Sequence, residues 1–396
     1  MNKFGKLLAL SLIAILTTLT TSPLLTRTAA QEQQAAPAVQ EEDRPGARAQ
    51  EMPSSVDAPT GYAPVTRTPK EVAATEAVER LKKVEPRVGR PRLPPTMDQG
   101  LYESLKNIAN NIIPMAKVGE PGKGTSQQAP VPEPQAPAVL KSVNFNGPAE
   151  AGWNPPDTHG AVGPNHFVAV TNSKINRYAK NGTLLNSSTL AAFFGYTTKG
   201  VFDPRVIYDK ASARWIIIAE AFQETATVQR FFVAASKTSD AMGAYWIYQF
   251  DVNTRNNDDF FDYPQLGVDK NDIIVTANIF GPSTYREGRV YTFPKATIYA
   301  GGTVSFTQYR ASFLNQGTIA PPVVLDTSAN SFLLTAPNGG SALRLYKLAD
   351  TATSRLTFYG TVPVTAYSIP PDAPQVAACT SQKLDTVDSR FVNAGT

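Results

Sequence analysis

From residue 141 onward, short apolar runs alternate with clusters of turn-forming residues. Runs such as RWIIIAEAF, RFFVAAS, YWIYQF and DIIVTANIF are six to nine residues long and rich in β-branched and aromatic side chains. This composition and length are typical of β-strands, and no run has the length of a long helix. The 256 residues of segment 141–396 are enough to bury a core as one domain. The pattern therefore predicts an all-β domain over residues 141–396.

The predicted strands recur in sets. Each set begins with Pro beside Asp or a small residue and continues with an apolar strand, a polar turn and a strongly apolar strand. The anchor positions Asp157, Asp203, Asp262 and Pro322 lie 46, 59 and 60 residues apart. Repeats of about 40–50 residues with four strands each are typical of a β-propeller. We therefore expect a propeller with about five blades of four-stranded sheet, because an irregular sandwich would lack this recurrence.

Closure of the propeller ring is an open point. A fifth repeat starts at SQKLDTVDSRFVNAG (381–395), where the sequence given stops as a strand begins. The ring is incomplete at the C-terminus unless the segment VLKSVNFNG (139–147) supplies the missing strands of the last blade.

The first thirty residues have the pattern of a signal peptide. Lys3 and Lys6 give a basic start, Leu7 to Leu19 is apolar, and Thr28-Ala29-Ala30 offers the small residues that a signal peptidase requires. An uncleaved N-terminal anchor is the alternative. We expect export to an extracellular, cell-surface or periplasmic location, and no transmembrane segment in the mature chain.

Residues 31–140 differ in composition from the rest. They hold 16 of the 32 prolines, no Phe or Trp, and two tyrosines. Such a segment buries too little apolar surface to offset its conformational entropy. We expect a Pro-rich, mostly disordered linker with short helices near 70–84 and 97–113.

Net charge and cysteine content exclude some classes of partner and of cross-link. Removing residues 1–30 takes away three basic residues and no acid, so the net charge of +4 becomes +1. A near-neutral chain lacks the electrostatic surface of a nucleic-acid binder. Cys379 is the only cysteine, which excludes an intrachain disulfide and leaves a buried thiol or an intermolecular link.

Both histidines of the chain lie in PPDTHGAVGPNHFVAV (155–170). Asp157, His159 and His166 together are a plausible ligand set for a transition metal if a turn brings them together. Gly160, Gly163 and Pro164 exclude a helix between the histidines, and this density of glycine and proline is what a tight turn requires. We interpret the stretch as a turn that leads into a strand, with the metal site as the alternative.

The aspartates that open the repeats form a second candidate site. If Asp157, Asp203 and Asp262 lie at equivalent points of successive blades, their carboxylates gather at one face of the propeller. Carboxylates so close together repel one another unless a cation or Arg neutralises them, which suggests a Ca²⁺ site. The simpler alternative is that each Asp caps its own turn by accepting backbone N–H bonds.

Other motifs add little chemistry. DVNTRNNDDFFD (251–262) lacks the turn glycine of a calcium loop and has Arg255 at a ligand position, so we interpret it as a solvated loop. TSDAMGAYW (238–246) is similar to the Asp box of sialidase-type propellers, a structural turn. No G-x-S-x-G, H-E-x-x-H or P-loop motif is present.

Five motifs, in order, carry a resemblance to a family. PPDTHGAVGPNHFV, DPRVIYDKASARW, SKTSDAMGAYWIYQF, DYPQLGVD and APQVAACTSQKLDTVDSRF together resemble secreted bacterial β-propeller-like proteins of unestablished activity, over residues 145–396. The resemblance implies a fold and an export route, and no catalytic residues. In that family the position of His159 is commonly Asn, and the chains continue past the DSRF motif into further strands.

Three functions fit these observations. The first is an exported, non-enzymatic module for binding or scaffolding, with an extracellular protein or a glycan as partner. The second is a secreted hydrolase that acts on polysaccharide through acidic residues in the propeller centre. The third is a non-functional remnant of a longer propeller protein. The only cofactor suggested is Ca²⁺.

Overall fold

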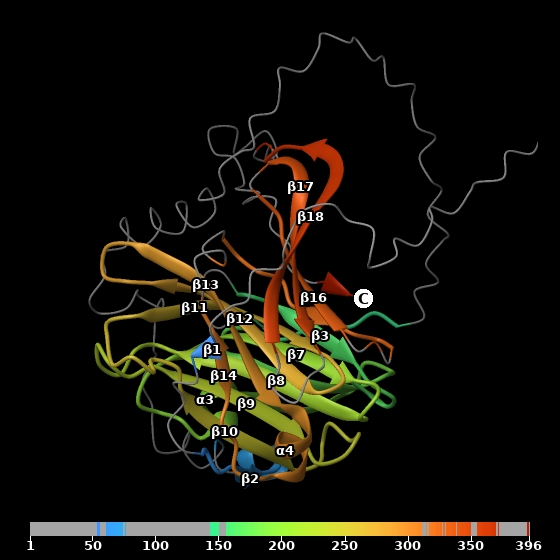
Figure 1. Ribbon diagram of the computed structural model, residues 1–396. Coiled ribbons are helices and arrows are strands. Elements are labelled where there is room, and N and C mark those ends of the chain that lie inside the picture. The colour runs from blue at the N-terminus through green and yellow to red at the C-terminus, as the bar shows by residue number, and fades with distance from the viewer. Residues whose placement is uncertain are drawn as a thin grey trace, which may run out of the picture. The chain divides into compact units, whose positions relative to one another are not determined.

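The computed structural model describes residues 54–55, 61–73, 76, 143–149, 156–310 and 394–395, together with residues 314–371 except 315–316, 327, 329, 338, 350–354 and 370. These residues are mostly strands, arranged as four sheets (Figure 1). Cys379 and the helix expected near 97–113 lie outside the described residues.

The first two sheets come from residues 159–251 and from one earlier strand. The first sheet has the order β3-β4-β5-β6 and is antiparallel throughout. Its strands are β3 (His159–Val162), β4 (His166–Val170), β5 (Lys174–Ala179) and β6 (Leu184–Thr189). The second sheet has the order β2-β10-β9-β8-β7, with β2 (Val65–Arg67), β7 (Val201–Asp209), β8 (Arg214–Ala221), β9 (Arg230–Ser236) and β10 (Tyr245–Asp251).

The third and fourth sheets come mainly from residues 260–367. The third has the order β1-β14-β13-β12-β11-β15-β19, in which β11, β15 and β19 run parallel. Its strands are β1 (Ser54–Ser55), β11 (Phe260–Val268), β12 (Asp272–Phe280), β13 (Tyr285–Pro294), β14 (Thr307–Tyr309), β15 (Pro322–Val323) and β19 (Ala394–Gly395). The fourth is antiparallel, with β16 (Asn330–Thr335), β17 (Gly340–Ala349) and β18 (Arg355–Tyr367).

The first three sequence repeats each open one sheet, whereas the fourth opens at β15, which belongs to the third sheet. Each of the four repeat anchors lies within or just before the strand that opens a repeat, namely β3, β7, β11 or β15. Strand β7 lies beside both β3 and β11 although the three belong to different sheets. The expectation of four-stranded blades is met by the first sheet, and by β7–β10 and β11–β14 within larger sheets. Among the described residues no sheet closes on itself, so the number of about five blades and the closure of a ring stay predictions.

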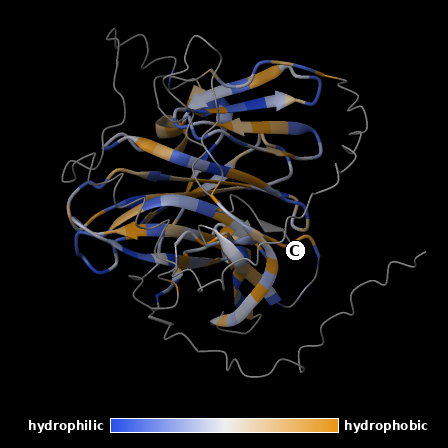
Figure 2. Ribbon diagram, turned by 90° about the horizontal axis from the view of Figure 1, so that it is seen from above, coloured by the Kyte–Doolittle hydropathy of each residue, from blue (hydrophilic) through white to orange (hydrophobic). Residues whose placement is uncertain are grey.

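Alternating side chains pack the sheets against one another, and in Figure 2 hydrophobic and hydrophilic colours alternate along many strands. On β8, Ile216 and Ile218 face the core shared with the third sheet, whereas Trp215 and Ile217 face the core shared with the first sheet. Ile274 of β12 likewise faces a third core, shared with the fourth sheet. A strand buried on both faces needs apolar residues at consecutive positions, which explains runs such as WIIIA.

Two short helices connect strands. In α3 (Leu190–Phe194), the Thr189 hydroxyl accepts a hydrogen bond from the amide of Ala192, and Gly195 ends the helix in the left-handed region at φ 68°. Helix α4 (Lys295–Ala300) ends in the same way at Gly301, at φ 73°. No helix in the described part of the chain is long and apolar enough to cross a membrane.

A segment that we expected to be part of a disordered linker instead belongs to the sheets. Residues 61–73 and 76, here called the N-terminal strap, contact three of the four sheets. The backbone of Tyr62 bonds that of Val304, which lies between α4 and β14 of the third sheet. Strand β2 pairs with β10 in the second sheet, and Asn186 of the first sheet donates a hydrogen bond to the carbonyl of Pro69. Val72 is only 2% exposed. Three contacts compensate the entropy that is lost when this segment becomes ordered: the pairing of β2 with β10, the burial of Val72 and the packing of Tyr62 against the core.

The strap includes part of an expected helix. Residues 69–73 and 76 are helical, and the remainder of the helix expected over 70–84 lies outside the described residues. Residues 143–149 form no strand, so the described part of 139–147 does not supply the missing strands of a last blade. Phe145 instead packs against Phe167 and Tyr178 of the first sheet, with ring centroids 6.1 and 4.9 Å away.

Candidate functional site

The strands that open the first three repeats share an unusual backbone conformation. Asp157 and Asp203 adopt left-handed φ values of 44° and 48°, and Tyr263 adopts 59°. Asp is one of the few non-glycine residues that tolerates this region. Strand pairing is interrupted at the second and third of these positions, between Phe202 and Arg205 and between Asp262 and Gln265. Such bulges bend a strand and re-aim its side chains, here at the place where β3, β7 and β11 lie side by side.

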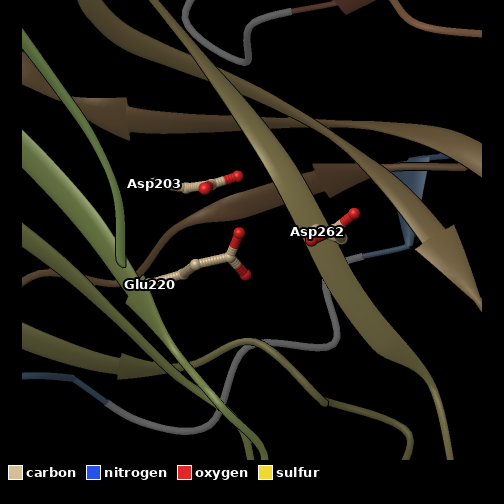
Figure 3. A group of neighbouring side chains, drawn as sticks. All are labelled: Asp203, Glu220 and Asp262. Atoms are coloured by element: carbon tan, nitrogen blue, oxygen red, sulfur yellow. The ribbon is translucent and has the colours of Figure 1, made fainter. Parts of the chain in front are cut away.

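Three carboxylates converge beside these bulges. Asp203, Glu220 and Asp262 each have a carboxylate oxygen within 4.8 Å of the others. Glu220 is fully buried, Asp262 is 3% exposed and Asp203 is half-buried. In Figure 3, Asp203 and Glu220 project toward the strand that carries Asp262. The side chain of Asp203 also shares a hydrogen bond with Asp157, which makes a group of four acids, here called the acidic cluster.

The pKa of Asp203 shows how strongly these groups interact. Burial of the carboxyl group raises this pKa well above its usual value, and the charges of Asp157 and Asp262 raise it further. Arg205 acts in the opposite direction but is the smallest of the contributions. The guanidinium of Arg205 is directed partly elsewhere, because its Nε donates to the carbonyl of Pro264 at 3.2 Å. Without a cation, Asp203 therefore holds a proton at a pH where an exposed aspartate is ionised.

Neutral amides support the acidic cluster. Asn172 donates a hydrogen bond from Nδ2 to Asp157 and accepts one at Oδ1 from the backbone N–H of Asp203, at 2.7 Å. Gln229 donates from Nε2 to Oε2 of Glu220 at 3.1 Å. An amide orients a carboxylate without neutralising its charge.

Two other buried acids of the domain are held by basic side chains. Asp259 contacts Arg289 at 2.9 Å, and Asp209 contacts Lys295 at 3.2 Å. These pairs compensate the buried charge within the protein. At Asp203, by contrast, the charges of two acids, Asp157 and Asp262, raise the pKa, and the charge of Arg205 lowers it by less.

The structure brings together the three aspartates that the repeats singled out, and it adds Glu220. Asp262 lies one residue before the position that is geometrically equivalent to Asp157 and Asp203, because Tyr263 adopts the left-handed conformation in the third repeat. Sequence reasoning missed Glu220, which lies on β8 and pairs with Phe202 of β7. Its signal was a single acid within the otherwise apolar run RWIIIAEAF.

The two histidines do not join this group, and the alternative ligand set of Asp157, His159 and His166 is not brought together. His159 begins β3, whereas His166 follows the turn and lies opposite Gly163, whose amide donates to the His166 carbonyl at 2.9 Å. Four residues of strand, about 13 Å, therefore separate their positions. His159 Nδ1 accepts a hydrogen bond from the amide of Val206 at 3.3 Å, and His166 Nδ1 lies 3.7 Å from Asp240. The stretch is a hairpin turn, as its glycines and proline indicated.

The two remaining motifs serve their own turns. Asp251 accepts hydrogen bonds at Oδ1 from the backbone amides of Gln229 and Asn253, at 3.3 and 3.1 Å. In the motif similar to an Asp box, Asp240 accepts from the amide of Met242 at 2.8 Å, and the Trp215 indole donates to the carbonyl of Ser239 at 3.0 Å. The bonds to Met242 and Asn253 are local capping of backbone groups, whereas those with Gln229 and Trp215 connect each motif to a neighbouring segment.

Comparison with known proteins gives few matches. No protein-family model matches the chain, and no curated protein matches its sequence. Among solved structures, an exo-β-1,3-galactanase from Phanerochaete chrysosporium with galactose matches at 11% identity and a TM-score of 0.32, over 54% of this chain and 50% of that one. An exo-β-1,3-galactanase from Clostridium thermocellum matches at 10% identity and 0.30, over 55% and 52%.

A GH43 endo-arabinanase from Bacillus licheniformis matches at 10% identity and a TM-score of 0.31, over 55% of this chain and 81% of that one. The chain thus spans about half the length of the galactanase structures. These likenesses are too weak to indicate a function for this chain.

Proposed function

We propose that the acidic cluster binds a divalent cation, with Ca²⁺ preferred, and that the bound cation joins the first three sheets of an exported binding or scaffolding module. The observation that carries this proposal is the convergence of Asp203, Glu220 and Asp262 to within 4.8 Å in a buried place. Export rests on the signal-peptide pattern of residues 1–30, and an extracellular protein or glycan is the proposed partner.

The spacing of the oxygens suits calcium. Ca²⁺ binds carboxylate oxygens at about 2.3–2.6 Å, so ligands on opposite sides of the ion lie up to about 5 Å apart. Mg²⁺ requires about 2.0–2.1 Å and near-ideal octahedral geometry, which corresponds to about 4.2 Å across the ion. The limit of 4.8 Å between the oxygens falls within the span that Ca²⁺ allows, and Ca²⁺ does not require the near-ideal geometry of Mg²⁺.

The electrostatics point in the same direction. In the apo protein, the charges of Asp157 and Asp262 oppose the ionisation of Asp203, and the charge of Arg205 offsets this only in part. A divalent cation would relieve the same repulsion without protonation. The amide donors Asn172 and Gln229 support this proposal, because they hold carboxylates in place and leave their charge available.

Calorimetric titration with CaCl₂ and thermal unfolding in Ca²⁺ and in EDTA test the proposal on residues 31–396. A ligand that binds only the folded state stabilises it by about 2.7 kcal/mol at one hundred times its Kd. We expect Asp203→Asn to be more stable than the unsubstituted protein in EDTA, because it removes repulsion, and to lose the response to Ca²⁺. Asp326→Asn, which changes an exposed acid outside the acidic cluster, should respond like the unsubstituted protein.

Two results would overturn the cation site. One is the absence of binding heat together with equal midpoints in Ca²⁺ and EDTA. The other is a Ca²⁺ response that Asp203→Asn leaves intact, which would place the cation elsewhere in the chain.

Hydrolysis of a polysaccharide is the second candidate, and the raised pKa of Asp203 favours it. A carboxylic acid that stays protonated beside ionised carboxylates is the arrangement of a general acid and its partner. Glycosidase carboxyl groups, however, lie about 5–5.5 Å apart in retaining and about 6.5–9.5 Å apart in inverting enzymes. The three oxygens here all lie within 4.8 Å of one another, which also fits one shared cation. Release of reducing ends from β-1,3-galactan or arabinan, abolished by Asp203→Asn in a folded protein, would instead establish the hydrolase.

A further inference from the structure

Gln229 occupies a central place between the second and third sheets. It immediately precedes β9 and its side chain is fully buried. Its Nε2 donates to Oε2 of Glu220 and to the carbonyl of Ala221, both at 3.1 Å, and to the carbonyl of Phe261 at 2.7 Å. Its Oε1 accepts from the amide of Phe261, also at 2.7 Å.

These bonds fix the orientation of the amide. Because Oε1 is the acceptor for the N–H of Phe261, the donor Nε2 must face Glu220, and a flipped amide would set oxygen against a carboxylate and two carbonyls. The assignment therefore follows from the whole set of partners. In this orientation the Gln229 side chain bonds Glu220 and the backbone of Phe261 in β11 at the same time.

The same contacts link two members of the acidic cluster. Glu220 is bonded directly, and Asp262 follows Phe261, whose backbone N–H and carbonyl both bond Gln229. One amide from the second sheet thus sets the separation between a carboxylate of its own sheet and a carboxylate of the third. A lysine or arginine in this place would also hold Glu220 but would neutralise it, in competition with a cation.

We propose that Gln229 is a positioning residue that presets the spacing of Glu220 and Asp262 for a cation, so that cation binding and docking of the second sheet on the third are coupled. This inference rests on the cation site proposed above. It assigns the coupling to one side chain, and it predicts that affinity for Ca²⁺ depends on Gln229 beyond any effect on stability.

Gln223 provides a matched control. It is also a buried glutamine that follows β8, and its Nε2 donates to the carbonyl of Asp259, just before β11, at 2.8 Å. It therefore crosses between the same two sheets, and this bond reaches the backbone rather than a carboxylate of the acidic cluster. A purely structural role should make variants at both glutamines behave alike.

The test compares Gln229→Ala and Gln223→Ala by calorimetric titration with CaCl₂, and by thermal unfolding in EDTA. Loss of a group that orients a metal ligand typically weakens affinity by about 10–100-fold. We expect that loss for Gln229→Ala and a change within about twofold for Gln223→Ala, although both variants lower the midpoint in EDTA. Equal Ca²⁺ affinity in Gln229→Ala and the unsubstituted protein would overturn the inference, as would equal losses at both glutamines.

A second measurement needs no variant. Hydrogen exchange of the unsubstituted protein in Ca²⁺ and EDTA should show extra protection by Ca²⁺ at the amide of Phe261, which donates a hydrogen bond to Oε1 of Gln229. Exchange should change little at the β9–β10 pair Ala235 and Trp246. Unchanged exchange at Phe261 in a protein that binds Ca²⁺ would overturn the coupling alone. A protein that does not bind Ca²⁺ at all would overturn the proposed cation site instead.

Discussion

The backbone N–H of Asp203 donates a hydrogen bond to the side chain of Asn172 over 2.7 Å, which ties the opening of β7 to the first sheet. The same amide side chain donates to Asp157, so one residue connects the openings of two repeats. The strained conformations at Asp157 and Asp203 are thus held by a neighbour in the fold. Substitutions among Asn172, Asp157 and Asp203 should therefore affect the response to Ca²⁺ and the free energy of unfolding differently.

The pH dependence of Asp203→Asn relative to the unsubstituted protein follows from the raised pKa of Asp203. An unfolded aspartate has a pKa of about 3.9, so above that pH the folded state binds more protons at this site than the unfolded state does. In EDTA, the contribution of Asp203 to stability should fall as the pH rises from about 4 through the folded pKa. The advantage of Asp203→Asn should widen over the same range. Urea unfolding at several pH values measures it, and an advantage that shrinks toward neutral pH would contradict the expected sign.

Calcium should reverse this trend in the unsubstituted protein. Because the cation competes with the proton for the same carboxylates, the rise in thermal midpoint at fixed Ca²⁺ should grow as the pH rises from about 4 through the folded pKa of Asp203. Asp203→Asn should show little rise at any of these values. A rise that does not depend on pH would indicate that no protonated carboxyl group takes part in the binding.

Val72→Ala tests whether the N-terminal strap contributes to the fold. Removing two methyl groups from a side chain that is 2% exposed should lower the free energy of unfolding by about 2 kcal/mol. Lys70→Ala, at an exposed position two residues earlier, should change it by less than about 0.5 kcal/mol. Equal effects in chemical unfolding would mean that the strap is not docked in solution.

Gly163→Ala tests the packing between the first two sheets. A Cβ at residue 163 would overlap the ring of Trp215, which is fully buried. Overpacking of this kind costs typically about 1–3 kcal/mol. Gly147→Ala, where a Cβ meets no atom within 4 Å, is the control. Tryptophan fluorescence should report both the lower stability of Gly163→Ala and a changed environment of Trp215, and an unchanged midpoint would contradict the packing.

Tyr299→Phe tests the buried group around Asp209. Burial alone would raise the pKa of Asp209, but the hydrogen bond from Tyr299 at 2.8 Å and the charge of Lys295 outweigh it and lower this pKa. Asp209 therefore stabilises the fold above about pH 3.9, and this contribution is lost as the pH falls through the folded pKa. We expect Tyr299→Phe to cost about 1–3 kcal/mol at neutral pH and less toward about pH 3.

Tyr367→Phe is the matched control for that experiment. Its hydroxyl donates to the carbonyl of Pro337 at 3.0 Å, where no carboxylate is involved. Its effect on the free energy of unfolding should vary little with pH. Parallel pH profiles for the two variants would exclude the role assigned to Asp209.

The parts of the fold that recur in the sequence were the predictable ones. Asp157, Asp203 and Asp262 mark the openings of β3, β7 and β11, and these strands meet because each opens a repeat. Glu220 could not be found in this way, since it lies on the second strand of its repeat and reaches the acidic cluster only through cross-strand pairing with Phe202. The one-residue offset at Tyr263 likewise depends on a bulge that no residue pattern specified.

The N-terminal strap was missed for a different reason. Its composition is polar and proline-rich, and β2 is only three residues long, so nothing local indicates a strand. Its partners lie far along the chain, where no periodicity connects them to residues 61–76. Apolar Val72 and Tyr62 become informative only once their burial sites exist.

That distance has a kinetic consequence. Gly61 bonds the hydroxyl of Ser305, a contact that spans 244 residues of chain. Non-local contacts slow folding, because the entropy of closing a long loop must be met before the contact stabilises anything. Docking of the strap should therefore be among the last events of folding. During synthesis, the N-terminal strap emerges before the strands that it contacts, and it can dock only after most of them have been made.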